Sequence, residues 1–135
     1  MLESYRKDIT FICKTAAMIY NIIPCPKPRM TQRDRWAKRP PVLRYWAFKD
    51  ACKAAGVTLP DAFKVVFYLP MPASWSKKKR AAMEGRPHQA KPDVDNLVKA
   101  LQDAVLDEDS GVWSIWAQKK WAVMPSIEII PLDDD

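Results

Sequence analysis

Two carboxylates, a carboxamide and an ammonium lie close together in residues 91–99, which read Lys-Pro-Asp-Val-Asp-Asn-Leu-Val-Lys. Asp93 and Asp95 are two residues apart, Asn96 follows directly, and Lys99 lies four residues beyond Asp95. Carboxylate oxygens with few other polar partners suit Mg²⁺, which binds through one or two carboxylates and completes its shell with waters and substrate phosphates. Because the surrounding chain is basic, a phosphodiester is the expected substrate. This segment predicts a metal-dependent enzyme that acts on nucleic acid.

The backbone around the two aspartates decides whether they can share an ion. Residues two apart point about 200° away from each other on a helix, whereas they share a face in extended backbone. Pro92 disfavours helical geometry at Lys91. We therefore expect an extended segment over 91–95, with Asp93 and Asp95 on one side and a helix just beyond, whose N-terminal dipole favours anions. The alternative is that one aspartate only caps this helix and the other is a surface residue.

Two roles stay open for Lys99. Its spacing from Asp95 is typical of a routine ion pair one helical turn apart. If the aspartates hold a metal, the ammonium instead lies beside a bound phosphate, where it would stabilise charge that develops at phosphorus or at the leaving oxygen.

A second acidic group lies at 107–111, which read Asp-Glu-Asp-Ser-Gly. The spacing of a calcium-binding loop fails here, because the twelfth residue from Asp107 is Gln118. A surface turn is the default for such a sequence. A helix of about a dozen residues separates this group from Asp93, so a returning strand could bring one carboxylate back to complete an ion site. Asp103 is a weaker candidate ligand, because it lies two turns down the same helix.

The basic residues are clustered rather than mixed with acids. Residues 1–99 contain 20 of the 22 Lys+Arg and 8 of the 16 Asp+Glu, for a net +12, whereas residues 100–135 carry a net −6. A basic body of this kind is typical of a nucleic-acid binder; the alternative is that the lysines merely solvate the surface. Phosphate contacts give affinity that depends on salt but not on base sequence. The residues expected to contact DNA are Lys27, Arg29, Arg33, Lys77, Lys78, Lys79, Arg80, Arg86 and Lys91.

Three tryptophans, Trp36, Trp46 and Trp75, lie within or near the basic clusters and could stack on unpaired bases. Tryptophans more often bury their large rings in the core. We therefore expect at least four of the six tryptophans to be core residues.

The length of 135 residues fits one domain with a single modest core. The apolar run 9–23 contains Lys14 and Asn21, is too short to span a bilayer and lacks a clear signal-cleavage site. Zinc is not expected, because a structural zinc site normally needs four ligands and the chain has one histidine and three cysteines without a Cys-x-x-Cys pair. Free cysteines are typical of a reducing compartment. We expect a soluble, cytoplasmic protein that does not bind membranes.

Regular elements are predicted from periodicity and turn residues. The strand candidates are 18–23, 63–69, 112–123 (as one strand or two) and 126–130. The helix candidates are 45–55 ended by Gly56, a short helix through Met83 capped by Ser74 or Ser76, and a helix from Val94 with apolar residues at helical spacing. The proline-rich segment 25–44 is expected to be largely extended. This order predicts an α+β domain with a small mixed or antiparallel sheet packed with helices.

The segment 91–105, Lys-Pro-Asp-Val-Asp-Asn-Leu-Val-Lys-Ala-Leu-Gln-Asp-Ala-Val, resembles the signature of RusA-type Holliday junction resolvases, which are often carried by phages and prophages. Three other segments are similar to the same family: 26–31, 72–83 and the acidic turn before Val112. Together they cover about residues 18–130 in the family's order. Residues 1–17 extend beyond the usual start, and 131–135 form an acidic tail.

This resemblance implies a small α+β endonuclease that works as a homodimer in DNA recombination or repair. It would bind four-way DNA junctions by their structure and nick two opposed strands with Mg²⁺ or Mn²⁺, without an organic cofactor. The family's metal-binding acids would fall on Asp93, Asp95 and Asp109, and its required lysine on Lys99. Because the turn carries an extra acid, Asp107 or Glu108 could take the place of Asp109.

A function from a different class is also compatible with the basic clusters: a non-catalytic, structure-specific protein that binds branched DNA. Such a protein would not need the Asp-x-Asp pair, so the acids favour the enzyme.

Overall fold

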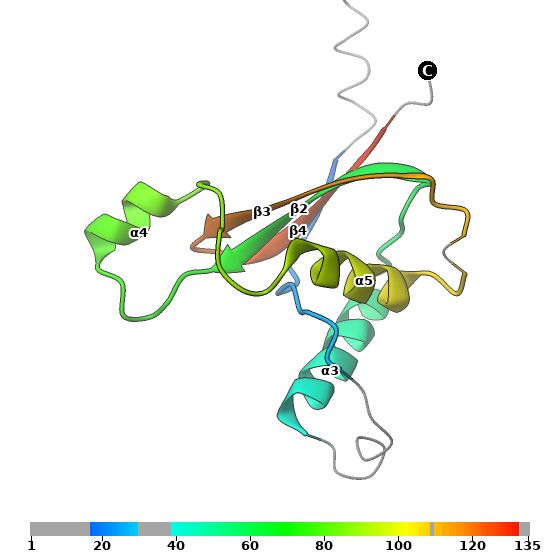
Figure 1. The fold of residues 1–135 in the computed structure, drawn as a ribbon, viewed down its shortest axis with the longest axis horizontal. Helices are drawn as coiled ribbons and strands as arrows, with labels where there is room; N and C mark the ends of the chain where they lie inside the picture. The colour runs from blue at the N-terminus through cyan, green and yellow to red at the C-terminus, as the bar shows by residue number, and fades with distance from the viewer. Residues whose placement is uncertain (1–16, 30–38, 109, 133–135) are drawn as a thin grey trace, which may run out of the picture.

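A four-stranded mixed sheet with helices on one face forms the part of the chain that the computed structural model describes, residues 17–29, 39–108 and 110–132 (Figure 1). Its elements in chain order are β1 (Met18–Tyr20), α3 (Pro40–Ala55), β2 (Ala62–Pro70), α4 (Lys77–Met83), α5 (Val94–Val105), β3 (Ser114–Ala122) and β4 (Ser126–Pro131). The strand order is β1-β4-β2-β3, with β2 and β3 parallel and the other pairs antiparallel. The predicted α+β class and small mixed sheet are confirmed.

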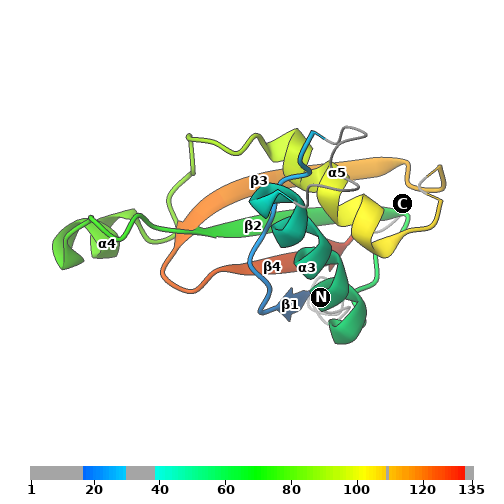
Figure 2. The same ribbon diagram turned by 90° about the horizontal axis from the view of Figure 1, so that it is seen from below.

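The parallel pairing of β2 with β3 requires a crossover, because a hairpin cannot join parallel strands. Residues 71–113 make this crossover and contain both α4 and α5. α5 lies against the same face of the sheet as α3, and the two helices contact each other (Figures 1 and 2). The N-terminal end of α5 is therefore held at the sheet by its own buried face.

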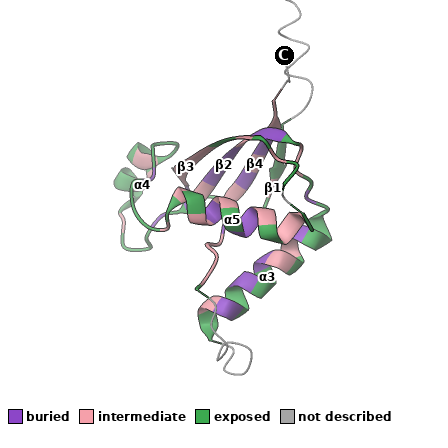
Figure 3. Cartoon of the chain, turned by 45° about the vertical axis from the view of Figure 1, so that its right-hand side comes forward, coloured by how far each residue is buried: buried purple, intermediate pink, exposed green. Residues whose placement is uncertain are grey.

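The core lies between this helical layer and the sheet (Figure 3). Phe63, Val65 and Phe67 alternate along β2 and are all 0% exposed, as expected for residues that share one face of a strand. Leu97 and Leu101 of α5 are four residues apart, so both face the sheet, and they are buried. Truncating one such side chain to alanine typically costs about 2–5 kcal/mol.

The predicted helix and strand boundaries are partly confirmed. Gly56 ends α3 in the left-handed conformation, with φ 67°, and Ser76 caps α4 by accepting the Lys79 N–H at 3.2 Å, as predicted. α3 begins at Pro40, however, within the segment expected to be extended. The reason is that proline fits the first turn of a helix, where its missing N–H would have no partner. β1 ends at Tyr20, earlier than predicted, and β3 is one continuous strand.

The prediction that most tryptophans are core residues is wrong for the described chain. Trp36 lies outside the described residues, and none of the other five tryptophans is buried. Trp116 of β3 is 54% exposed and Trp113, just before β3, is 66% exposed. For Trp116 the physical reason is that it pairs with Lys64 and so lies on the face of the sheet that the helices do not cover. The core is filled mainly by Phe, Leu, Ile and Val instead.

Residues 71–90, called the arm below, extend beyond the end of β2 and away from α3 and α5 (Figures 1 and 2). The arm carries α4 and then returns along β3. Its return is held by backbone bonds to that strand: Gly85 N–H to Trp121 O at 2.9 Å, Trp121 N–H to Arg86 O at 2.9 Å and His88 N–H to Lys119 O at 3.0 Å. The chain therefore reaches the start of α5 from an ordered, strand-paired segment.

Candidate functional site

Asp93 and Asp95 both lie at the N-terminal end of α5, as predicted. Asp93 is the N-cap residue with extended backbone, φ −69° and ψ 144°, and Asp95 is in the first turn. The expectation that the extended segment would reach residue 95 is therefore wrong, because the helix already begins at Val94. The burial of Leu97 and Leu101 explains this early start, since it needs helical backbone from the preceding turn onward. Asp93 precedes the helix, so the rule that side chains two apart on a helix point about 200° away from each other does not apply to this pair.

The side chains of Asp93 and Asp95 make no described contact that stabilises the fold. Both are exposed, and the Asp93 side chain makes no capping hydrogen bond although it occupies the N-cap position. Within the described residues, no hydrogen bond or ion pair engages either carboxylate. Both carboxylates are therefore available to a cation or to another ligand outside the described chain.

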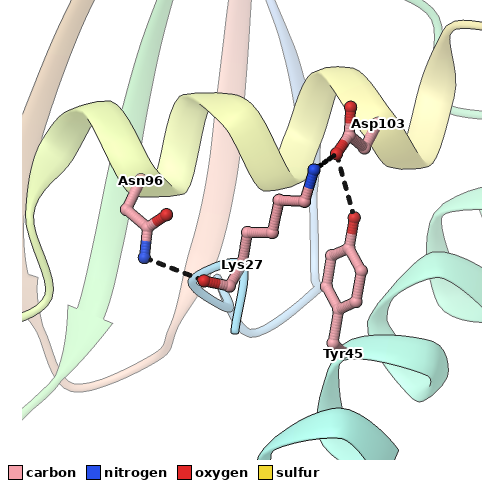
Figure 4. Close-up of polar contacts among 4 residues, drawn as sticks. All are labelled: Lys27, Tyr45, Asn96 and Asp103. Carbon is pink, nitrogen blue, oxygen red and sulfur yellow. Dashed lines mark hydrogen bonds and ion pairs between the residues drawn. The ribbon is translucent and has the colours of Figure 1, made fainter. Parts of the chain in front are cut away.

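Asn96 has a structural role beside them. Its Nδ2 donates to the backbone oxygen of Lys27 at 3.1 Å, which ties the segment after β1 to the first turn of α5 (Figure 4). Pro26, Pro92, Asp93 and Asn96, together with Lys91, line an open hollow of about 480 Å³ at this junction. One carboxylate of the pair thus borders a solvent-filled space large enough for a phosphate group.

Asp103 is engaged elsewhere on α5. Its Oδ2 forms an ion pair with Lys27 Nζ and accepts the Tyr45 hydroxyl at 3.3 Å (Figure 4). Burial, and then the charge of Asp103, raise the pKa of Tyr45 to about 12, so the hydroxyl stays a donor. Asp103 therefore joins α5 to α3 and to the segment after β1, which accounts for it without a metal. Lys27, expected to contact DNA, has its charge offset by this pair.

Lys99 is exposed one helical turn beyond Asp95. In the described part of the chain it forms no ion pair within 4 Å, so the routine pair with Asp95 is not formed. The ammonium is available to an anion that approaches the N-terminal half of α5.

The acidic turn lies at the opposite end of α5. Asp107 and Glu108 follow its last residues, and a helix of 12 residues is about 18 Å long. Glu108 Oε1 accepts the Ser110 N–H at 3.2 Å, within the turn itself. The structure thus does not bring Asp107 or Glu108 to Asp93, and Asp109 lies outside the described residues. No three His, Cys, Asp or Glu side chains among the residues placed by the structure form a metal-binding group.

Among the described residues, the acids without a structural role that could hold a metal are therefore Asp93 and Asp95. This set fits Mg²⁺, which commonly takes one or two carboxylates and fills its other positions with water and substrate phosphate. It does not fit a closed, all-protein site of the kind that structural zinc requires.

The basic residues of the arm divide into two kinds. Lys77 and Lys78 are exposed and have no partner within the described chain. Arg80 is committed to the arm, because its Nε donates to Trp75 O at 3.3 Å and its Nη2 to Pro72 O at 3.0 Å. Lys79 lies over the Trp75 ring, with Nζ 4.3 Å from the centroid. On α4, the charges free to meet phosphate are thus those of Lys77 and Lys78.

Trp75 has partners within the protein. Its ring contacts that of Trp121 at a centroid distance of 4.8 Å, and the Lys79 ammonium approaches it as well. His88 stacks on the same Trp121 at 3.9 Å. Burial, and then the charge of Lys119, lower the pKa of His88, whose Nδ1 accepts the Ala90 N–H at 3.4 Å. This aromatic group holds the arm on β3.

The other residues expected to contact DNA lie on the chain that returns from α4 and on the segment after β1. Arg86 and Lys91 are exposed between α4 and Asp93, and Arg29 is exposed on the segment after β1. Arg33 lies outside the described residues. Arg86 and Lys91 thus place exposed basic residues along the chain between α4 and the aspartate pair, and this stretch is called the basic path below.

Lys119 of β3 was missed by sequence reasoning. Its ammonium donates to two backbone oxygens directly before Asp93, those of Ala90 at 2.6 Å and Pro92 at 2.7 Å. A signal was available: in an alternating strand, Lys119 falls on the same side as Ala117 and Trp121, the side that faces the helices.

Two general features bear on the class of protein. None of the described helices combines the length and apolarity that a membrane crossing requires. Cys25 and Cys52 are free thiols, and burial raises the pKa of Cys52 to about 11.

Comparisons with known proteins agree with the predicted resemblance. The family described as Endodeoxyribonuclease RusA matches residues 20–130, which is most of the chain. "Uncharacterized protein YqaN" of Bacillus subtilis (strain 168) is 39% identical over 83 residues, a match that covers 55% of this chain and 58% of that protein. The match therefore spans less than two thirds of the relative's length. No solved structure matches the chain significantly.

The division of the arm's basic residues predicts different effects of substitution. The double change Lys77→Ala and Lys78→Ala should weaken binding to four-way and linear DNA alike, because these charges are free to meet phosphate. It should lower the slope of log affinity against log salt by roughly two, about one per lost contact. Fluorescence anisotropy over a salt series measures both quantities.

Arg80→Ala should instead lower the thermal midpoint, since it leaves two loop carbonyls without their donor. Lys53→Ala, which removes an exposed lysine at the far end of α3, is the matched control and should change neither property. An unchanged salt slope in the double variant would show that Lys77 and Lys78 do not contact DNA.

Proposed function

This chain belongs to the RusA endodeoxyribonuclease family, and we propose that it is a divalent-metal-dependent nuclease that binds four-way DNA junctions and resolves them by paired, symmetric nicks. The observation that carries the proposal is the pair Asp93 and Asp95, two exposed carboxylates without a described partner, within the family's signature and at the end of the basic path. We propose further that it acts in the cytoplasm in DNA recombination or repair and that a phage or prophage encodes it.

The proposed metal is Mg²⁺, with Mn²⁺ as a substitute. Asp93 and Asp95 would hold it at the N-terminal end of α5. When bound, such an ion supplies an activated water and neutralises charge on the scissile phosphate. The dipole of α5 favours the phosphate at the same end of the helix. Asp109 is kept as the third acid on the strength of the family resemblance alone, and Asp109→Asn compared with Asp107→Asn and Glu108→Gln would identify which acid of the turn is required.

The chain's own residues then divide the work of binding and catalysis. Lys99 would stabilise charge that develops at phosphorus or at the leaving oxygen, because its ammonium is unpaired and one turn from Asp95. Lys77, Lys78 and Lys79 of α4 would contact the DNA backbone away from the cut, and Arg86 and Lys91 would continue this contact toward the aspartates. Affinity would then come from phosphate contacts and junction selectivity from the shape of the basic surface.

A homodimer would supply the symmetry that junction resolution needs. Two cuts related by an approximate two-fold axis require two sites, and each chain offers one Asp93–Asp95 pair. Apolar side chains are exposed on the face of the sheet away from α3 and α5, where Trp116 is 54% and Ile19 is 61% exposed. Such surface is available for pairing across a two-fold axis.

Cleavage of synthetic four-way, three-way and linear DNA with and without Mg²⁺ tests the function. We expect paired nicks at symmetric positions of the four-way junction, only with the metal. Tight junction binding without any nicking would instead identify a non-catalytic protein that binds branched DNA.

Asp93→Asn should abolish cleavage while leaving junction binding intact or tighter. Removing the carboxylate loses the ion but also lowers repulsion with phosphate. Gel-shift and nicking assays on one preparation measure both effects. Asp50→Asn, an exposed aspartate on α3, is the matched control and should behave as the parent. Cleavage by Asp93→Asn within a few-fold of the parent would exclude Asp93 as a ligand.

Lys99→Met should lower the single-turnover cleavage rate by roughly 100- to 1000-fold, the usual effect of removing one donor to a developing charge. Junction affinity should change little, because the contact forms mainly in the transition state. If Lys99 merely paired with Asp95, its replacement would cost about 0.5 kcal/mol of helix stability and little activity. A parent-like rate would therefore assign Lys99 that structural role.

The purified protein should be a dimer of about 31 kDa, twice the chain mass of 15.5 kDa. Light scattering at micromolar concentration measures this directly. A monomer in solution that still made paired cuts would show that dimers form on DNA. A monomer that made only single nicks would replace the resolvase by a structure-specific nickase.

A further inference from the structure

Lys119 occupies a position on β3 where an apolar residue is expected. It pairs with Phe67 of β2, which is 0% exposed, so its side chain leaves the sheet on the face covered by the helices. Lys119 is half-buried there, and its ammonium bonds acceptors before α5 instead of extending into solvent. This position therefore suggests that the ammonium serves a specific partner.

The partners of Lys119 are the two backbone oxygens that flank Lys91. Its Nζ donates to Ala90 O at 2.6 Å and to Pro92 O at 2.7 Å, both short bonds in which the donor is charged. The backbone of Lys119 holds the same segment, because its carbonyl accepts the His88 N–H at 3.0 Å. One residue of β3 thus fixes residues 88–92 through both its side chain and its main chain.

Asp93 depends on this fixation. Its side chain makes no capping bond and is exposed, so no described contact of its own orients the carboxylate. Its carbonyl accepts the Leu97 N–H at 3.2 Å, which fixes its C-terminal side to α5. On its N-terminal side, the peptide that joins it to Pro92 is held by the bond to Lys119. The direction in which the Asp93 side chain leaves the backbone is therefore set by a peptide that Lys119 holds.

We propose that Lys119 is a positioning residue, which fixes the peptide before Asp93 so that the carboxylate meets the divalent ion in the required geometry. The inference rests on the proposed function, because it concerns the same metal pair. Mg²⁺ demands near-ideal octahedral geometry at short distances, so a small shift of one ligand is costly. Groups that orient metal ligands typically change metal affinity or activity by about 10- to 100-fold when they are lost.

The Lys119→Met variant tests the proposal, with Lys120→Met as its matched control. Lys120 is the next residue of the strand, and its pairing with Tyr68 places it on the face away from the helices. Binding of Mn²⁺ alone, followed by the paramagnetic resonance of the free ion, gives a readout that does not depend on cleavage. Junction affinity in chelator and the thermal midpoint are measured on the same preparations.

Lys119→Met should weaken Mn²⁺ binding by about 10- to 100-fold and raise the Mg²⁺ concentration needed for half-maximal cleavage by a similar factor. Junction affinity in chelator should stay within a few-fold of the parent. Lys119→Arg should recover part of the loss, because a guanidinium can also donate to both carbonyls. Lys120→Met should bind Mn²⁺ as the parent does.

Parent-like Mn²⁺ binding by Lys119→Met would overturn the inference and leave the proposed function standing. If that variant does not fold, Lys119→Gln, which keeps a donor for one carbonyl, carries the same test: weakened Mn²⁺ binding supports the inference and parent-like binding overturns it. A parent protein that neither binds Mn²⁺ nor cleaves would overturn the proposed function, and the inference with it.

Discussion

The parallel pairing of β2 with β3 is the constraint on which the candidate site depends. Because parallel neighbours need a crossover, the chain must leave the sheet after Pro70 and return at Ser114. The crossover is long enough to carry the arm outward, to return it along β3 and to lay α5 on the sheet (Figures 1 and 3). The aspartate pair lies at the point where the returning arm becomes α5, and Lys119 of β3 holds the short connection between them.

The polar residues around α5 fall into two groups according to whether they have partners. Asn96, Asp103 and Lys119 hold segments that are distant in sequence, and each has a specific acceptor or donor. Asp93, Asp95 and Lys99 are exposed and unpaired within the described chain. Since the fold does not use this second group, its members are the ones available to an ion and a phosphate.

Local signals account for what the sequence could predict. The apolar spacing of Leu97 and Leu101 predicted α5, Gly56 predicted the end of α3, and the sequence around Pro92 predicted that both aspartates lie at the N-terminal end of α5. Contacts between distant segments account for what it could not. The partners of Lys119 are backbone oxygens that only the crossover brings to β3, and the exposure of Trp116 follows from its place on the face that the helices leave uncovered. Likewise, the separation of Glu108 from Asp93 depends on the full length of α5.

The central claim is that Asp93 and Asp95 hold the divalent ion of a junction nuclease. The most direct measurement is the position of Mn²⁺ by anomalous scattering in crystals of the protein bound to a four-way junction. The account predicts an ion peak on the order of 2 Å from carboxylate oxygens of both aspartates and beside a junction phosphate. A well-occupied ion elsewhere in the complex, with neither aspartate among its ligands, would contradict it.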